Sequence, residues 1–222
     1  MLHEKISATR IEFIEPMYAL GVRSLSEGPD WLYEIKLDGY RCITVRNSSG
    51  VNLWSRRGNL FTAQFPAIAE ACKKLPPGTL VDSGIVALHE HGQNSFNLLQ
   101  HHRSNAFAIR YYLFDLLVHR GKSLINAPLS ERRASLPKLK LPSDQDSFVL
   151  SETIDASVPD LIRAAKELSL EGIIAKRKDS LYESAKRTGA WVKYKINKGQ
   201  EFVIGGHTPG NPFDVAASIA FQ

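Results

Sequence analysis

Residues 31–41 read WLYEIKLDGYR and place one lysine between two carboxylates near the end of a predicted strand. With a period of two, the apolar side chains of this stretch share one strand face and its charged side chains share the other. The apolar face holds Trp31, Tyr33, Ile35 and Leu37, and the charged face holds Glu34, Lys36 and Asp38. Gly39 interrupts the alternation, which is typical of a tight turn or a close backbone approach. We therefore predict that the first face joins the core and that Lys36 faces a cleft.

Strand and helix patterns alternate irregularly along the rest of the chain. The predicted strands cover residues 40–47, 51–55, 80–88, 108–118, 170–176 and 190–196, with one more around Phe148. The first two form a predicted hairpin. The predicted helices cover residues 62–74 and 129–136, and two more begin at Ser95 and Ser157. Asp160 follows Ser157 by three residues, which is the spacing of a capping box.

Length and composition predict an ordinary globular protein. The chain has 222 residues, of which 43% are hydrophobic, so we expect one large or two small domains with a real core. No apolar run approaches the roughly 20 residues needed to cross a bilayer, and the first ten residues lack the apolar segment of a secretory signal. We therefore expect a cytosolic protein without membrane contact.

Positive charge is concentrated late in the chain. Residues 163–198 hold ten Lys or Arg and four acids, in a chain whose net charge is +5. Several of these cations alternate with apolar residues in strand-like stretches. This pattern favours a surface that receives phosphates over a solvated helix face.

The cysteines and one histidine pair carry little functional signal. Cys42 and Cys72 lie far apart among apolar neighbours, outside any CxxC pattern, so buried free thiols are favoured over a metal site or a disulfide. His101 and His102 stand beside Arg103 without a further ligand at metal-like spacing. We expect them on the surface or at a helix end.

Five short motifs follow one another along the chain. They are KLDG at residues 36–39, SRRG at 55–58, LFDLL at 113–117, EGIIAK at 171–176 and WVKYK at 191–195. In this order they resemble the covalent nucleotidyltransferase superfamily of ATP-dependent DNA ligases, RNA ligases and mRNA capping enzymes. Three further stretches, EFVIGGHTPG, PLSERR and EGIIAKRKDSLYE, are most similar to the ligase domain of bacterial ligase D-type enzymes. The resemblance runs from about Phe13 to Gly210.

The resemblance makes Lys36 the catalytic nucleophile. An amine that attacks the α-phosphate of ATP must be unprotonated, whereas a free lysine has a pKa of roughly 10.4, so nearby cations and a metal must disfavour its charged form. Lys36 would then form a lysyl-AMP phosphoramidate and release pyrophosphate. From the residues alone, Lys36 could instead be a surface lysine paired with Glu34 or Asp38.

The resemblance also implies a nucleotide-binding set. Glu34 would accept a hydrogen bond from the adenine amine, which favours ATP over GTP, and Phe114 would stack on the purine. Guanidinium groups would hold the ribose or the phosphates, and Lys193 and Lys195, which share a strand face, would reach the α-phosphate. The full set is Glu34, Ile35, Arg41, Arg56, Phe114, Lys193 and Lys195. Lys176 is not clearly aimed at the same place, and Arg57 is expected to be a solvated charge.

Two carboxylates are the predicted metal residues. Glu171 matches a family carboxylate near the divalent ion, and Asp38 lies in the nucleophile motif. The implied cofactors are ATP and Mg²⁺ (or Mn²⁺). Mg²⁺ commonly uses one or two carboxylates together with substrate phosphates and water.

Two departures from the family pattern bear on activity. In the family, the strand after the prolines carries an acid in a D-G-E or D-x-E arrangement, whereas Asp82-Ser83-Gly84 places glycine where the glutamate belongs. That carboxylate would help to hold the ribose or a metal, so Gly84 is expected to weaken ATP binding or adenylation. The family also continues into an OB-fold domain, and this chain is expected to end within its first strands.

The resemblance implies an α+β nucleotidyltransferase (DNA ligase adenylation) fold, in which antiparallel sheets flanked by helices enclose an ATP cleft. We predict an adenylation domain at residues 1–199 and, at 200–222, the start of a truncated OB-fold or a C-terminal tail. The implied function is AMP transfer to a DNA 5′-phosphate for nick sealing in DNA repair. The implied partners are nicked double-stranded DNA and an end-joining protein such as Ku, and the implied state is a monomer in the bacterial cytoplasm, associated with the nucleoid.

Two alternatives remain open from the sequence. RNA ligase or capping-type activity belongs to the same chemical family and would prefer RNA ends or GTP. A non-catalytic nucleotide- or DNA-binding relic is favoured by Gly84 and by the expected truncation.

Overall fold

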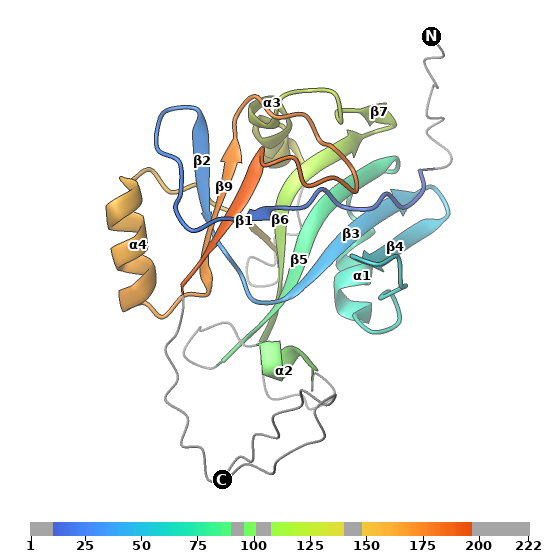
Figure 1. The fold of residues 1–222 in the computed structure, drawn as a ribbon. Helices are drawn as coiled ribbons and strands as arrows, with labels where there is room; N and C mark the ends of the chain where they lie inside the picture. The colour runs from blue at the N-terminus through green and yellow to red at the C-terminus, as the bar shows by residue number, and fades with distance from the viewer. Residues whose placement is uncertain (1–10, 90–95, 101–107, 140–147, 197–222) are drawn as a thin grey trace, which may run out of the picture.

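Two β-sheets form the centre of the protein, and short helices flank them (Figure 1). The computed structural model describes residues 11–89, 96–100, 108–139 and 148–196. The four-stranded sheet has the order β1 (Leu20–Gly21), β10 (Trp191–Lys195), β9 (Gly172–Arg177) and β2 (Trp31–Ile35). The six-stranded sheet has the order β4 (Gly50–Ser55), β3 (Tyr40–Asn47), β5 (Thr79–Leu88), β6 (Ala108–His119) and β7 (Lys122–Ser123), and β8 (Phe148–Leu150) also pairs with β6.

Most of these strand pairs are antiparallel, as the sequence predicts. Two pairs are parallel, β1 with β10 and β6 with β8. The expected α+β fold is therefore confirmed, with mixed rather than purely antiparallel sheets.

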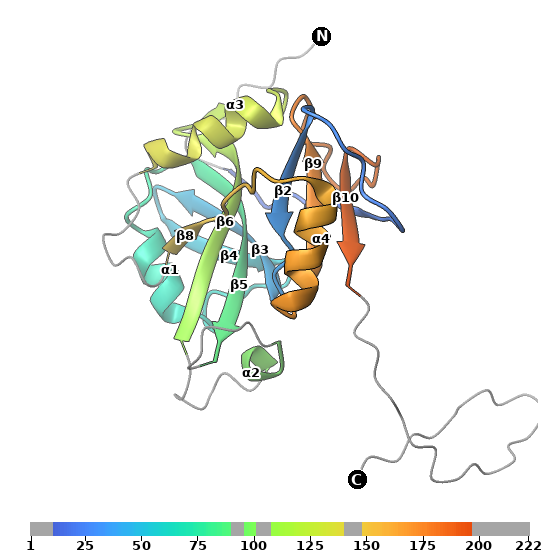
Figure 2. The ribbon, with the colours of Figure 1, turned by 90° about the vertical axis from the view of Figure 1, so that its left-hand side faces the viewer.

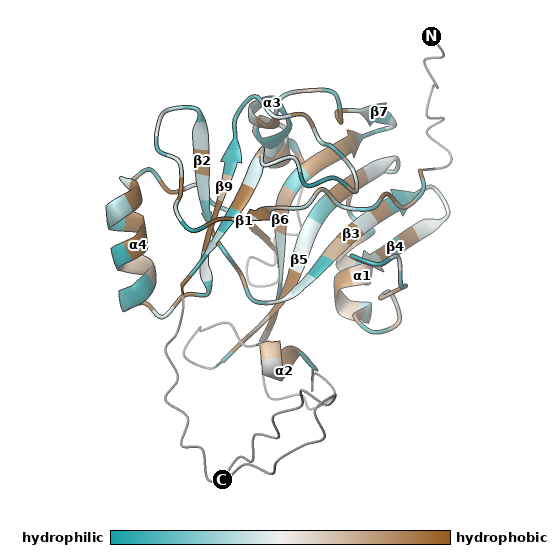
Figure 3. Ribbon diagram, in the orientation of Figure 1, coloured by the Kyte–Doolittle hydropathy of each residue, from teal (hydrophilic) through white to brown (hydrophobic). Residues whose placement is uncertain are grey.

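The helices lie outside the sheets. They are α1 (Pro66–Cys72), α2 (Phe96–Gln100), α3 (Leu129–Ala134), the 3-10 helix η1 (Leu136–Lys138) and α4 (Val158–Glu167). Turned by 90°, the molecule shows α4 in front of the four-stranded sheet and α1 beside the six-stranded sheet (Figure 2). Most of α4 is coloured hydrophilic and much of β6 hydrophobic (Figure 3), and the buried residues of α4 are Val158, Leu161 and Ala165.

Two buried clusters hold the four-stranded sheet in place. On its outer face, Leu161 of α4 packs with Ile173 of β9. Between the two sheets, Trp191 of β10 packs with Ile43 of β3 and Leu80 of β5. Burial of such side chains stabilises the fold by roughly 1.5–3 kcal/mol each. The apolar packing between the two sheets therefore holds them together.

A third cluster anchors α1, and it contains both cysteines. Ile68 and Cys72 of this helix pack with Cys42 and Leu53 of the six-stranded sheet. Both thiols are free and buried, as predicted. Burial raises the pKa of Cys42 to about 12 and raises the pKa of Cys72 as well, so both remain protonated.

Most predicted elements are confirmed, but two helices differ from the sequence pattern. The helix predicted at 62–74 begins only at Pro66, because proline lacks an N–H and suits the first helical turn. The helix predicted at 129–136 is divided into α3 and η1 ahead of Pro137. The helix predicted from Ser157 is α4, and its capping bond from the Asp160 N–H to Ser157 Oγ is 3.3 Å long.

The predicted division of β2 into an apolar and a charged face is wrong at its C-terminal end. Glu34 is only 2% exposed, whereas Ile35 is 37% exposed. Glu34 points into the space between the sheets, where buried cations compensate its charge. Ile35 is the last residue of β2 and lines a pocket instead of the core.

Some predictions fall outside the described residues. These are the positions of His101 and His102 and the character of residues 200–222. Within the described residues, no helix combines the length and the apolar character needed to cross a membrane.

Candidate functional site

A pocket of about 190 Å³ opens between the two sheets. Four-stranded-sheet residues that line it include Lys36, just after β2, together with Lys176 and Lys193, and the six-stranded sheet contributes Arg41 and Phe114. The sequence-predicted residues that line it are Glu34, Ile35, Lys36, Arg41, Arg56, Phe114 and Lys193. Asp38, Glu171 and Lys195 do not line it, and Lys195 is exposed.

Backbone contacts fix Lys36 at the edge of this pocket. Its N–H donates to the Gly172 carbonyl at 2.9 Å, directly after β2 ends. A Cβ on Gly172, whose φ is +156°, would lie 2.0 Å from the Tyr194 carbonyl oxygen, so only glycine fits there. The close approach predicted at Gly39 is also confirmed, because a Cβ there would lie 2.3 Å from the Ile85 carbonyl oxygen.

Glu171 is the acidic partner of Lys36. The Lys36 ammonium forms an ion pair with Glu171 Oε1. Glu171 Oε2 is buried and accepts no hydrogen bond from the described residues. A buried carboxylate oxygen without a donor suits a divalent cation, so the residue fits the predicted metal role. The described residues contain no group of three or more His, Cys, Asp or Glu side chains that could hold a metal by themselves.

A cluster of cations surrounds the lysine. The pKa of Lys193 is lowered, first by burial and then by the charges of Lys36, Lys195, Arg187 and Arg56. Such a concentration of like charge favours an anionic ligand such as a polyphosphate.

One aromatic ring organises part of this cluster. The guanidinium carbon of Arg56 lies 4.2 Å from the centroid of Tyr18, and that of Arg187 lies 5.6 Å from it. Tyr18 and Arg187 also line the pocket, although sequence reasoning did not select them. The signal for Arg187 was its place in the late basic segment, and no local pattern distinguishes Tyr18.

Glu34 is held by a set of buried donors. Lys176 Nζ lies 2.9 Å from each carboxylate oxygen, Arg133 Nη1 lies 2.6 Å from Oε1, and Ser151 Oγ donates to Oε2 at 3.0 Å. Each oxygen therefore accepts two hydrogen bonds, which fills the capacity of a carboxylate. Lys176, which the sequence does not clearly direct to the α-phosphate, lines the pocket beside the Glu34 carboxylate.

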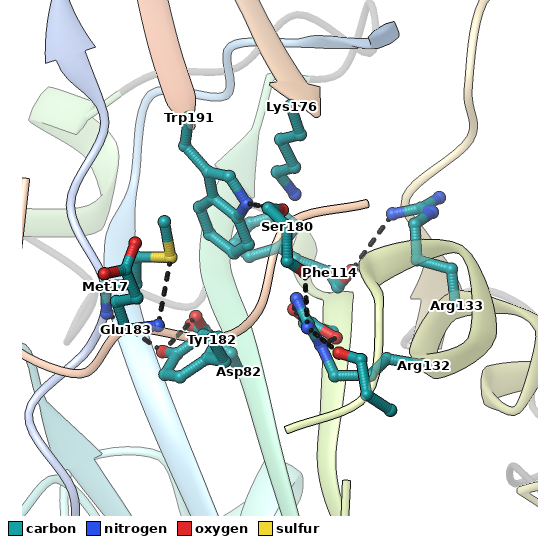
Figure 4. Close-up of polar contacts among 12 residues, drawn as sticks. Met17, Asp82, Phe114, Arg132, Arg133, Lys176, Ser180, Tyr182, Glu183 and Trp191 are labelled. Atoms are coloured by element: carbon teal, nitrogen blue, oxygen red, sulfur yellow. Dashed lines mark hydrogen bonds and ion pairs between the residues drawn. The ribbon is translucent and has the colours of Figure 1, made fainter. Parts of the chain in front are cut away.

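Lys176 lies between two aromatic rings (Figure 4). Its Nζ is 4.5 Å from the ring centroid of Trp191 and 5.4 Å from that of Phe114. Burial lowers the pKa of Lys176, and the charge of Arg133 acts in the same direction, while Glu34 opposes both. The base of the pocket thus combines aromatic surface with a buried amine.

Arg41 is engaged by Asp82 and is not a free cation. Its guanidinium forms an ion pair with both Asp82 oxygens, and Asp82 Oδ2 also accepts a hydrogen bond from the Tyr182 hydroxyl at 2.7 Å. Burial acts to lower the pKa of Arg41, but these partners raise it overall. Asp82 is therefore engaged by Arg41 and Tyr182, and it does not line the pocket.

Phe114 occupies the space above Gly84. A Cβ on Gly84 would lie 2.8 Å from Phe114 Cζ, closer than real Cβ contacts. Because β5 and β6 are neighbouring strands, with Gly84 opposite Tyr112, the ring lies across the strand that carries the glycine. The ring of Phe114 can therefore take this position because residue 84 is a glycine, and a larger residue there would displace it.

A second buried ion pair sets the position of α3. Arg132 Nη2 lies 2.8 Å from Asp115 Oδ2, and both side chains are fully buried. Arg132 also donates to the Ser180 carbonyl at 2.9 Å (Figure 4). This anchor turns Arg133, the next residue of α3, toward the Phe114 carbonyl, to which it donates at 3.0 Å. Asp115, paired with Arg132, does not line the pocket that Phe114 lines.

The late basic segment does not form one continuous face. Lys176 and Lys193 belong to the pocket, whereas Arg163 lies on α4. Arg177 is paired with Asp179 on the surface.

A family comparison agrees with this geometry. The profile of the family described as "ATP dependent DNA ligase domain" matches residues 16–195. The chain belongs to this family. The match covers the elements from β1 to β10, including every pocket residue described above.

Individual relatives point the same way. The chain is 38% identical over 204 residues to the multifunctional non-homologous end joining protein LigD of Pseudomonas aeruginosa, covering 89% of this chain and 24% of that protein. It is 28% identical over 199 residues to the SPbeta prophage-derived DNA ligase-like protein LigB of Bacillus subtilis, covering 88% of this chain and 72% of that protein. The chain thus spans about a quarter of the LigD relative.

A solved structure shares the fold. The mycobacterial DNA ligase D complexed with ATP and MES superposes with a TM-score of 0.70 at 29% identity, over 83% of this chain and 62% of that one. The predicted nucleotidyltransferase fold and the predicted resemblance to ligase D-type enzymes are therefore confirmed.

Proposed function

We propose that this chain takes AMP from ATP onto Lys36 and passes it to the 5′-phosphate of nicked DNA. The observation that carries the proposal is the position of Lys36 inside a cation-rich pocket, paired with Glu171. A DNA ligase family match supports the same chemistry.

In the first step, the lone pair of Lys36 Nζ attacks the α-phosphorus of ATP. A P–N bond forms, the bond from the α-phosphorus to the bridging oxygen breaks, and pyrophosphate leaves with the electron pair. The lysine must lose its proton before attack, and the carboxylate of Glu171 is the adjacent acceptor. Lys193, Arg56 and Arg187 line the pocket and orient the phosphates.

A bound Mg²⁺ or Mn²⁺ would neutralise phosphate charge, and Glu171 Oε2 is the ligand that this chain offers it. Neither Asp38 nor Glu171 lines the pocket, but Glu171 is paired with Lys36, so we assign the ion contact to Glu171 and not to Asp38.

The base-binding part of the pocket is proposed to use Phe114 and Lys176. Because both oxygens of Glu34 already accept two hydrogen bonds, it can accept from the adenine amine only if a donor leaves. Lys176 uses two of its three protons on Glu34, which leaves one for a purine acceptor. The ring of Phe114 offers a stacking surface beside this amine.

In the later steps, a DNA 5′-phosphate oxygen attacks the lysyl-AMP phosphorus and the P–N bond breaks. A 3′-hydroxyl then attacks the activated 5′-phosphate, and AMP leaves as the nick closes. Nicked double-stranded DNA is the proposed substrate, and the end-joining names of the relatives support a role in DNA repair. An end-joining protein such as Ku as partner, a monomeric state and a cytoplasmic, nucleoid-associated location belong to the same proposal.

Intact-mass spectrometry after incubation with ATP and Mg²⁺ tests the first step. We expect covalent AMP on the wild-type chain, lost in acid as a phosphoramidate should be, and none on Lys36→Ala. Lys166→Ala is the matched control, because Lys166 is an exposed lysine of α4 outside the pocket. A wild-type chain without adduct, despite ATP binding, would support the non-catalytic alternative that Gly84 raises. An adduct with GTP in preference to ATP would support capping-type chemistry.

A further inference from the structure

A second depression, of about 580 Å³, lies away from the nucleotide pocket and is lined by cations. It forms where the far end of β3, the residues after α1, the β6–β7 turn and η1 meet. Its lining residues are Arg46, Lys73, Lys74, Leu75, Pro76, Pro77, Arg120 and Lys138. None of them is acidic. Arg41, at the pocket end of β3, is five residues from Arg46, or about 17 Å along the strand.

The backbone of this depression is fixed by close contacts at Gly78. The Gly78 N–H donates to the Arg46 carbonyl at 2.7 Å, and the Gly78 carbonyl accepts from the Gly121 N–H at 2.8 Å. Gly78 has a φ of +78°, and a Cβ there would lie 2.7 Å from the Gly121 nitrogen. Three chain segments that carry cations are therefore held together before any ligand arrives.

Most of the positive charge in the depression is unneutralised within the described residues. Glu70 pairs with Lys73, whereas Lys74, Arg120 and Lys138 form no ion pair with any residue that the structure describes. The pKa of the neighbouring His119 is lowered, first by burial and then by Arg120 and Lys138. Arg120 and Lys138, from separate chain segments, thus both contribute positive charge near His119.

The side chains that line the depression favour one kind of binding partner over others. A protein interface usually needs aromatic or aliphatic anchors, and single-stranded nucleic acid usually needs aromatic rings on which bases stack. The lining contains no aromatic residue, and its one aliphatic side chain, Leu75, is buried. Exposed Lys and Arg without aromatic neighbours suit the regularly spaced phosphates of a duplex backbone.

We propose that this depression is a second duplex-DNA contact, which binds backbone phosphates remote from the nucleotide pocket. It adds affinity without sequence preference. The contact extends the substrate of the proposed function, but it does not depend on the adenylation chemistry.

A salt series tests the proposal. The variant Lys74→Gln/Arg120→Asn removes two cations of the depression, and Asn suits the φ of +52° at position 120. The control, Arg163→Gln/Lys166→Gln, removes two exposed cations from α4, of which Arg163 is paired with Asp160. Fluorescence anisotropy with a labelled nicked duplex, and with a single strand of the same sequence, gives log K against log salt for each chain.

We expect the duplex slope of the Lys74→Gln/Arg120→Asn variant to fall in magnitude by about 1.8, or about 0.9 for each lost phosphate contact. The α4 control should keep the wild-type slope, and AMP adduct formation should be equal in all three chains. An unchanged duplex slope overturns the proposal, as does an equal fall in the control, because net charge alone would then account for it. A larger fall on the single strand than on the duplex also overturns it. Failure of AMP addition in every chain would count against the proposed function. The salt slopes of duplex binding would still decide whether the depression contacts DNA.

Discussion

Glu34 accepts hydrogen bonds from both sheets and from α3, so this one carboxylate joins three parts of the structure. Lys176 belongs to the same sheet as Glu34, Ser151 follows β8 of the other sheet, and Arg133 belongs to α3. Burying a carboxylate is costly unless donors replace water. The network therefore supports the base-binding end of the pocket as well as the fold.

Replacing Arg133 by methionine should lower the free energy of unfolding by about 1.5–3 kcal/mol. The change keeps an extended side chain but removes the hydrogen bonds to Glu34, to the Phe114 carbonyl and to the Ser151 carbonyl. Urea unfolding at a constant m-value gives the difference directly. Arg133→Lys should recover only part of the loss, because an ammonium cannot span these acceptors. Equal stability of Arg133→Met and wild type would show that Lys176 and Ser151 suffice for Glu34.

Adding a side chain at Gly84 should slow adenylation, contrary to the expectation from sequence alone. That expectation is that Gly84→Glu restores a family carboxylate and speeds the reaction. In the structure, a Cβ would lie 2.8 Å from Phe114 Cζ, so the ring must move. Such overpacking commonly costs about 1–3 kcal/mol.

Gly84→Ala separates the two effects, because it adds the Cβ without the carboxylate. We expect slower single-turnover AMP addition for Gly84→Ala and no faster addition for Gly84→Glu than for wild type. A Gly84→Glu chain that outpaces both others would show that the carboxylate matters more than the displaced ring.

Motifs predicted some site residues well and others not at all. Lys36 and Phe114 could be selected because they belong to short local patterns, and both line the pocket. Lys176 could not be assigned a role, because its place beside Glu34 depends on the pairing of β9 with β2, which the local sequence does not encode. Tyr18 could not be selected, because only tertiary contacts with distant arginines distinguish it.

At the scale of elements, α4 offers a direct test of a predicted cap. Ser157→Ala removes the acceptor for the Asp160 N–H and should destabilise the protein by about 1 kcal/mol. Thermal and urea unfolding both measure this loss. Ser24→Ala, at an exposed loop serine, should change stability little. If the two variants have the same free energy of unfolding, the capping hydrogen bond stabilises the protein no more than a hydrogen bond from the same N–H to water.

Strands were predicted more accurately than helices, for a physical reason. β5 and β6 are long and buried, so their apolar composition identifies them without further information. α1 and α3 are shorter than their apolar patterns suggest, because prolines decide where the first begins and where the second gives way to η1. Their extent depends on packing against β4 and β6 that the local sequence does not encode.

At the scale of the whole molecule, the pocket is a gap between two sheets that pack together over only part of their faces. Trp191 marks this boundary, since its ring packs in the core between the sheets and also lines the pocket. The sequence predicted two sheets around a cleft, but it could not predict the parallel pairings of β1 and β8, which join segments distant in the chain. A ligand in this gap contacts both sheets and should resist their separation.

ATP should therefore raise the unfolding temperature of the whole chain. Binding to the folded state alone adds about 2.7 kcal/mol at a ligand concentration one hundred times Kd. We expect the shift in wild type and in Lys36→Ala, because the variant loses the nucleophile but keeps Phe114, Lys176 and the phosphate-binding cations. Removing divalent metal with EDTA should reduce the shift in both, since the triphosphate would then meet the unshielded carboxylate of Glu171. Differential scanning calorimetry with ATP, with GTP and without nucleotide makes the comparison. A shift in wild type but not in Lys36→Ala would mean that stabilisation comes from the covalent adduct, and the pocket would not hold the nucleotide as argued.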